Sequence, residues 1–113
     1  MTGPERLALV EQLMARYNAH DADGYVALMT ETACEATYRG AVLRDGREGV
    51  RSGLKAMFEQ FPQNRAVVHA SYVVGDKVVL HEEVFRSDTT PPFEVISIYC
   101  FVDGLVDRVE FVR

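Results

Sequence analysis

Hydrophobic residues recur at helical spacing in three segments of the first half of the chain. Thr2 and Glu5 stand at the spacing of a capping box, which predicts that a helix begins directly after Thr2. Asp21 is suited to cap a second, shorter helix, and Asp45, with Glu48 three residues later, is suited to cap a third. The predicted helices span residues 3 to about 18–20, 22 to about 29, and 46 to 61, where Pro62 ends the last one.

The second half of the chain is typical of β-strands, because it is rich in Val, Ile, Tyr and Phe. Two-residue turns at Gly75-Asp76 and Asp103-Gly104 divide it into two hairpins. A further strand with a bend at Gly40 lies between the second and third helices. The strands are predicted over residues 33–46, 66–74, 77–86, 93–102 and 105–112. Together the elements predict a single α+β domain over residues 1–113, with three helices packed on one face of a strongly curved antiparallel sheet.

The turn at Asp103-Gly104 fixes a register for the second hairpin, and alternation then sorts its side chains onto two faces. One face is almost entirely apolar and is therefore predicted to be the core. The other carries Tyr99 opposite Arg108 and is predicted to be a subunit interface or a partly wet surface. The predicted core face consists of Ile96, Ile98, Cys100, Val102, Leu105, Val109 and Phe111, and the outer face of Val95, Ser97, Tyr99, Phe101, Val106, Arg108, Glu110 and Val112.

The turn at Gly75-Asp76 places His69 directly opposite Glu82, with Cβ atoms within about 5.5 Å of each other. His81 and Glu83 then lie on the reverse face of the same hairpin. Both faces of this hairpin are apolar enough to be buried, so periodicity alone does not decide which one faces the core. A His–Glu pair in an apolar pocket would make a general base, because the carboxylate fixes the tautomer of the ring. A pair that satisfies itself at the surface is the alternative.

The composition narrows the possible functions. Hydrophobic residues make up 48% of the chain and charged residues 26%, which is typical of a soluble globular protein. The net charge of -5 argues against a nucleic-acid partner. We expect no membrane span, no signal peptide and a reducing cytoplasmic location, with Cys34 and Cys100 unpaired. Because the three histidines lack metal-binding spacing and no phosphate loop is present, we expect no metal and no cofactor.

The stretches NAHDADGYVALMTETA after the first helix and DGLVDRVEFV at the end, in this order of elements, resemble the nuclear transport factor 2-like superfamily. Within it the chain is most similar to the SnoaL-type polyketide cyclase and ketosteroid isomerase branch. The resemblance covers nearly the whole chain. It implies a cone-shaped, cystatin-like fold with an apolar pocket for a small ligand, and a homodimer formed through the outer face of the sheet.

The resemblance also orients the first hairpin, since the pocket-lining positions of the isomerases fall on the face that carries Glu82. It implies that His69 and Glu82 face the pocket. The positions of the ketosteroid isomerase base, protonated aspartate and oxyanion tyrosine fall on Thr37, Ile98 and Leu13, so that catalytic set is absent. The resemblance and the predicted core faces together give the expected pocket lining as Leu13, Thr37, Leu80, Val84, Ile96, Ile98, Val109 and Phe111.

Two classes of function follow from these expectations. The first is a proton-transfer enzyme, isomerase- or cyclase-like, that acts on a small apolar carbonyl substrate. In it His69 is the base, Glu82 orients His69, and Tyr17 donates a hydrogen bond to the developing oxyanion. The alternative is a non-catalytic homodimer that binds a ligand or serves as a scaffold, and a third possibility is recruitment of a protein partner through the outer sheet face. Fold resemblance alone does not rank these functions.

Overall fold

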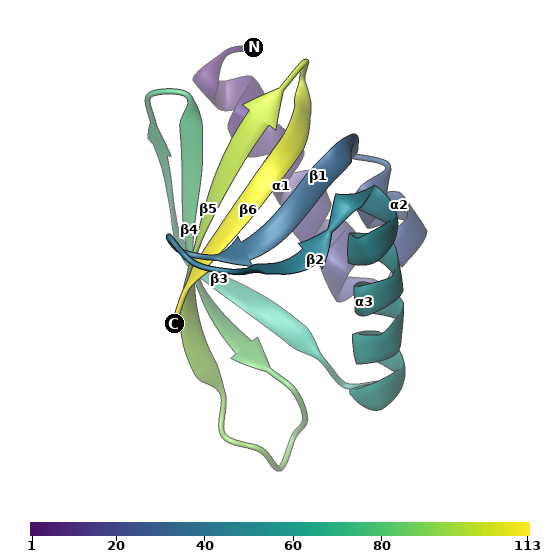
Figure 1. Cartoon of the computed structure of the whole chain (residues 1–113). Coiled ribbons are helices and arrows are strands. Elements are labelled where there is room, and N and C mark those ends of the chain that lie inside the picture. The colour runs from purple at the N-terminus through teal and green to yellow at the C-terminus, as the bar shows by residue number, and fades with distance from the viewer.

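The computed structural model describes all residues, 1–113, and shows three helices on one side of a curved six-stranded sheet (Figure 1). This confirms the predicted α+β fold. The elements are α1 (Gly3–Asn18), α2 (Ala22–Val26), β1 (Met29–Thr37), β2 (Val42–Asp45), α3 (Gly46–Gln60), β3 (Arg65–Val74), β4 (Lys77–Phe85), β5 (Phe93–Val102) and β6 (Leu105–Val112).

The predicted N-terminal capping residues make capping hydrogen bonds in two of the three helices. The hydroxyl of Thr2 accepts a hydrogen bond from the backbone N–H of Glu5, whose carboxylate accepts one from the N–H of Thr2, so the predicted capping box is present. Asp21 caps α2 through the N–H of Gly24. The predicted cap at Asp45 is wrong in detail, since α3 begins there but the Asp45 side chain makes no capping bond.

The sheet has the order β2-β1-β6-β5-β4-β3. All neighbouring strands are antiparallel except β1 and β6, which are parallel. β1 also begins at Met29, well before the predicted start at residue 33, and α2 is correspondingly shorter than predicted. The last strand of the sequence, β6, therefore lies between the first strand, β1, and β5 near the centre of the sheet (Figure 1).

A β-bulge at His69 changes the register of the first hairpin. Ala70 pairs with His81 as the turn predicts, but Val68 pairs with Glu82, so His69 is the extra residue between them. A bulge inserts one unpaired residue and shifts every later pairing by one position. The predicted pairing of His69 with Glu82 is therefore wrong.

A second bulge, at Asp107, changes the register of the other hairpin. Phe101 pairs with Val106 as predicted, but Cys100 pairs with Arg108 and Tyr99 with Val109, which leaves Asp107 unpaired. Its carboxylate instead accepts a hydrogen bond of 2.7 Å from the Thr30 hydroxyl on β1.

The two faces of β5 are the reverse of the prediction. Val95, Ser97 and Tyr99 are buried, whereas Ile96 and Ile98 are only half-buried on the outer face. The predicted core face is therefore wrong for β5, while on β6 Val109 is buried as predicted. The core lies between the three helices and the inner face of the sheet. No helix has the length and apolar character needed to cross a membrane.

Candidate functional site

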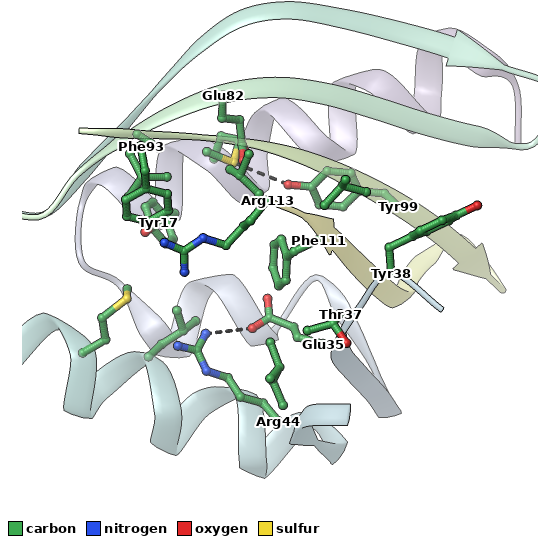
Figure 2. Close-up of a pocket in the computed structure, with 18 of the residues that line it drawn as sticks. Tyr17, Glu35, Thr37, Tyr38, Arg44, Glu82, Phe93, Tyr99, Phe111 and Arg113 are labelled. Carbon is green, nitrogen blue, oxygen red and sulfur yellow. Dashed lines mark hydrogen bonds and ion pairs between the residues drawn. The ribbon is translucent and has the colours of Figure 1, made fainter. Parts of the chain in front are cut away.

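A pocket of about 740 Å³ lies between the helices and the inner face of the sheet. It is predominantly apolar, because 14 of the 20 residues that line it are hydrophobic, a count that includes four tyrosines whose hydroxyl groups are also polar. A few polar side chains project into it from several elements (Figure 2). A concave apolar site with a small number of placed polar groups is the usual form of a small-molecule site. The polar and charged lining residues are Tyr17, Tyr25, Glu35, Thr37, Tyr38, Arg44, Glu82, Arg86, Tyr99 and Arg113.

Glu82 is the most unusual of these side chains. It lies on β4, where strict alternation buries Val78, Leu80, Glu82 and Val84 on the inner face. Only 4% of its surface is exposed. The Ser97 hydroxyl on the neighbouring strand β5 donates a 2.9 Å hydrogen bond to Glu82 Oε2. The other oxygen, Oε1, is buried and has no hydrogen-bond partner within the protein. One carboxylate oxygen is thus fixed in place and the other is free to interact with a ligand.

This environment raises the pKa of Glu82 to about 7. Burial is the main cause, because it disfavours the charged form, and the negative charge of Glu35 acts in the same direction. The hydrogen bond from Ser97 opposes them by stabilising the carboxylate. A carboxyl group with a pKa near neutrality both accepts and releases a proton readily at physiological pH, which is the property of an effective general base.

The second buried carboxylate, Glu35 on β1, is fully engaged. Arg44 Nη1 donates to its Oε1 at 2.8 Å (Figure 2). The Tyr25 hydroxyl donates to its Oε2 at 2.9 Å. The exposed fraction of Glu35 is 1%. Because both oxygens accept hydrogen bonds from well-placed donors, this carboxylate has a structural role. The two carboxylates therefore have different roles, since only Glu82 has an unsatisfied oxygen.

Tyr17 on α1 is oriented by a buried amide. The side-chain N–H of Asn64 donates a 2.8 Å hydrogen bond to the Tyr17 hydroxyl oxygen. Arg86 in turn donates to the Asn64 side-chain oxygen at 2.8 Å, which fixes which way the amide points. Because the Tyr17 oxygen accepts in this contact, its own proton is available to a ligand. Asn64 is thus a positioning residue for a hydrogen-bond donor in the pocket.

Two further tyrosines in the pocket remain neutral donors. Burial, reinforced by the carboxylates of Glu35 and Glu82, raises the pKa values of Tyr25 and Tyr99 well above the ordinary value. The proton of Tyr25 is committed to Glu35. The Tyr99 hydroxyl contacts only the sulfur of Met14, at 3.7 Å (Figure 2). Thioether sulfur is a weak acceptor, so Tyr99 is available as a second donor to a polar ligand atom.

The structure places five of the predicted site residues in the pocket and leaves six outside its lining. Tyr17, Glu82, Thr37, Val84 and Phe111 line it. Leu13, Leu80 and Val109 are buried in the core but do not line the pocket. Ile96 and Ile98 lie on the outer face of β5, because Val95, Ser97 and Tyr99 occupy its buried face. His69 is the sixth.

His69 lies on the outer side of the sheet and is exposed. Its Nε2 is 3.0 Å from the carboxylate of Glu83, and its ring lies 5.4 Å from that of His81. His81 in turn contacts Glu94 at 2.8 Å. His81 and Glu83 thus share the outer face as predicted, but His69 joins them there instead of facing the pocket. No three side chains of His, Cys, Asp or Glu converge closely enough to bind a metal ion.

Sequence reasoning missed the residues that support the pocket groups. Ser97 lies within the apolar strand FEVISIYCFV, and a lone serine flanked by isoleucines is the signal that this position faces a polar partner. Asn64 directly precedes β3 in a stretch that reads as a turn, so its side chain gave no sign of burial. The pair of Glu35 and Arg44 joins two strands through a bulged register that no turn rule predicts.

These features define a class of protein: a small α+β domain with an apolar pocket between helices and sheet and, inside that pocket, a buried carboxylate with one unsatisfied oxygen. The family model of the SnoaL-like domain matches residues 10–109, so the chain belongs to the SnoaL-like domain family. No curated protein sequence matches the chain.

Solved structures share the fold. An uncharacterised cystatin-fold protein from Novosphingobium aromaticivorans is 44% identical, with a TM-score of 0.90 over 100% of this chain and 99% of that one. A protein named as a candidate SnoaL-like polyketide cyclase from Jannaschia sp. CCS1 is 18% identical, with a TM-score of 0.81 over 96% and 85% of the two chains. AclR, named as a candidate hydroxylase from Streptomyces galilaeus, is 19% identical, with a TM-score of 0.79 over 98% and 79%.

Proposed function

We propose that the protein is a proton-transfer enzyme, isomerase- or cyclase-like, that acts on a small, largely apolar carbonyl compound bound in the pocket. The observation that carries this proposal is Glu82, a buried carboxylate with one free oxygen and a pKa of about 7 in an apolar cavity. Glu82 therefore replaces His69 as the proposed base. The expectation that the protein is not a ketosteroid isomerase still rests on the absence of that family's catalytic set.

In the proposed reaction, Glu82 Oε1 removes a proton from the carbon next to the substrate carbonyl. The electron pair of the broken C–H bond moves to form an enolate, and its negative charge develops on the carbonyl oxygen. The Tyr17 hydroxyl donates a hydrogen bond to that oxygen. Protonated Glu82 then returns the proton to the same carbon or to a neighbouring one. Preorganised donors of this kind stabilise the charge that develops in the transition state.

The roles of the supporting residues follow from their contacts. Ser97 holds Glu82 Oε2 at 2.9 Å and so directs the other oxygen into the pocket. Asn64 orients the Tyr17 hydroxyl so that its proton is available to substrate. The apolar lining lowers the local dielectric, which keeps the Glu82 pKa high and strengthens the hydrogen bond to the oxyanion.

The proposal predicts exchange of substrate protons for deuterium. The wild-type protein is expected to accelerate exchange at the carbon next to the carbonyl in some members of a panel of cyclic and aryl ketones, such as 2-tetralone, followed by proton NMR in deuterated buffer. Because the base must be ionised, the second-order rate is expected to rise with pH and level off above a pKa of about 7. Binding of ketones without exchange would instead favour the non-catalytic ligand-binding alternative.

We also propose that two copies associate through the outer face of the sheet. Apolar side chains on that face support this arrangement, since Val67 and Tyr72 are exposed and Ile96 and Ile98 are half-buried. Sedimentation is expected to give twice the 12.7 kDa mass of one chain, and Ile98→Arg is expected to give the monomer mass. A wild-type monomer at micromolar concentration would contradict the proposed dimer and leave the pocket chemistry unaffected.

A further inference from the structure

Two arginines at the pocket have no carboxylate partner. Arg113 and Arg86 both line the cavity, and neither belongs to any of the ion pairs in the molecule. By contrast, the third arginine of the lining, Arg44, is paired with Glu35. Arg86 donates only to the neutral groups of Asn64 and Met57. Arg86 is half-buried and Arg113 is exposed, so both positive charges are accessible to a ligand that enters the cavity.

Both guanidinium groups pack on one aromatic ring. The Arg113 guanidinium carbon lies 3.9 Å from the centre of the Phe93 ring, and that of Arg86 lies 5.2 Å from it. The close-up shows the Arg113 side chain extending into the cavity with its guanidinium beside Phe93 (Figure 2). Stacking on an aromatic face holds a guanidinium in one plane while leaving its N–H donors free for a ligand. Phe93 thus orients both guanidinium groups, while Nη1 of Arg86 already donates to Met57 and Asn64 and its other N–H groups remain available.

Neither arginine interacts with the proposed base. Their charges are not among the causes of the Glu82 pKa, which are burial, Ser97 and Glu35. Neither donates a hydrogen bond to Glu82. Glu82 and the two arginines are therefore not paired with one another, and each remains able to interact with a different part of a ligand.

We infer that Arg113 and Arg86 form a subsite for a carboxylate group of the substrate, which makes the substrate an apolar carbonyl compound that carries a carboxylic acid. This inference rests on the proposed function for the carbonyl part, but the subsite itself is argued only from the two arginines and Phe93. A guanidinium donates two parallel hydrogen bonds to a carboxylate, which fixes its position as well as its charge. A monoanion is favoured over a dianionic phosphate because Glu35 and Glu82 also face the cavity.

Calorimetric titration with a matched ligand pair tests the subsite without any reaction. The probes are naphthalene-2-acetate and its neutral isostere naphthalene-2-acetamide, which share the same apolar body. Wild-type protein is expected to bind the acid at least about tenfold more tightly than the amide. Arg113→Gln is expected to reduce this preference several-fold, since it removes one of the two cations and weakens binding of the acid more than binding of the amide.

Arg65→Gln is the matched control. Arg65 also stacks on a phenylalanine, with its guanidinium carbon 4.1 Å from the Phe85 ring, and it also has no ion pair, but it does not line the pocket. This variant is expected to keep the wild-type preference for the acid. Because the Arg86 side chain also supports Asn64, it is tested by Arg86→Lys, which keeps the positive charge and is expected to reduce the preference only partly.

Several results would overturn the inference. These are equal affinities of the two probes for wild-type protein, an unchanged preference in Arg113→Gln, no binding of the acid at millimolar concentration, or tighter binding of the corresponding naphthyl phosphonate. A failure of the proposed proton-transfer reaction is detected by a different measurement from a failure of the carboxylate subsite. Glu82→Gln is expected to abolish ketone exchange while keeping the preference for the acid, so a loss of one property without the other identifies which proposal is wrong.

Discussion

Replacement of Glu82 by glutamine is expected to slow deuterium exchange on a bound ketone by at least about 100-fold, since a positioned general base contributes about 10² to 10⁴ in rate. Glutamine has nearly the same shape and keeps a hydrogen-bond acceptor for Ser97, but its amide does not take up a proton. The measurement is the initial rate of α-proton exchange by NMR at about pH 8, above the pKa of about 7, where wild-type Glu82 is ionised.

The neighbouring residue on the same strand provides a matched control. Glu83→Gln makes the same chemical change one position along β4, but Glu83 lies on the outer face against His69. It is expected to keep the wild-type exchange rate, as is His69→Ala. Tyr17→Phe is expected to slow exchange by about 100-fold through loss of one oxyanion donor. An unchanged rate in Glu82→Gln, or a large loss in His69→Ala, would show that the base has been assigned to the wrong residue.

The comparison of sequence with structure shows which features local patterns encode. The helices were predictable because their signals lie within a few residues, such as the box formed by Thr2 and Glu5 and the buried stripe of Val50, Leu54 and Phe58. The inward position of Glu82 was correct, and it depended on the resemblance because both faces of its hairpin are apolar. The burial of Glu82 was therefore predictable, but its hydrogen-bond partner, Ser97, was not.

The errors have two physical origins. Turn residues fix the register only next to the turn, and each hairpin contains a bulge further along, at His69 and at Asp107. A bulge depends on contacts outside the hairpin, and the bond between Asp107 and Thr30, 77 residues apart, is an example. The count of apolar residues also misled, because the outer face of β5 carries Ile96 and Ile98 whereas its buried face carries Ser97. The inner face of the sheet carries polar residues because that face borders the pocket.

The buried carboxyl group also makes a prediction for stability. The ordinary pKa of 4.5 rises to about 7 in the folded protein, so between these pH values the folded state binds more protons than the unfolded state. The free energy of unfolding must therefore fall as the pH rises through this range. Below about pH 4.5 Glu82 is protonated in both states and causes no loss. Above about pH 7 it is ionised in both, and the full cost of burying the charge, about 3 kcal/mol, is present.

The measurement is the difference in unfolding free energy between Glu82→Gln and wild type, from urea titrations at pH 4.5, 6 and 8. The difference removes the contributions of all other titrating groups, and it is expected to change by about 3 kcal/mol in favour of the variant as the pH rises. Glu83→Gln, on the outer face, is expected to show no such trend. Parallel curves for Glu82→Gln and wild type would mean that Glu82 titrates normally in the folded protein, and the proposed base would then lack its defining property.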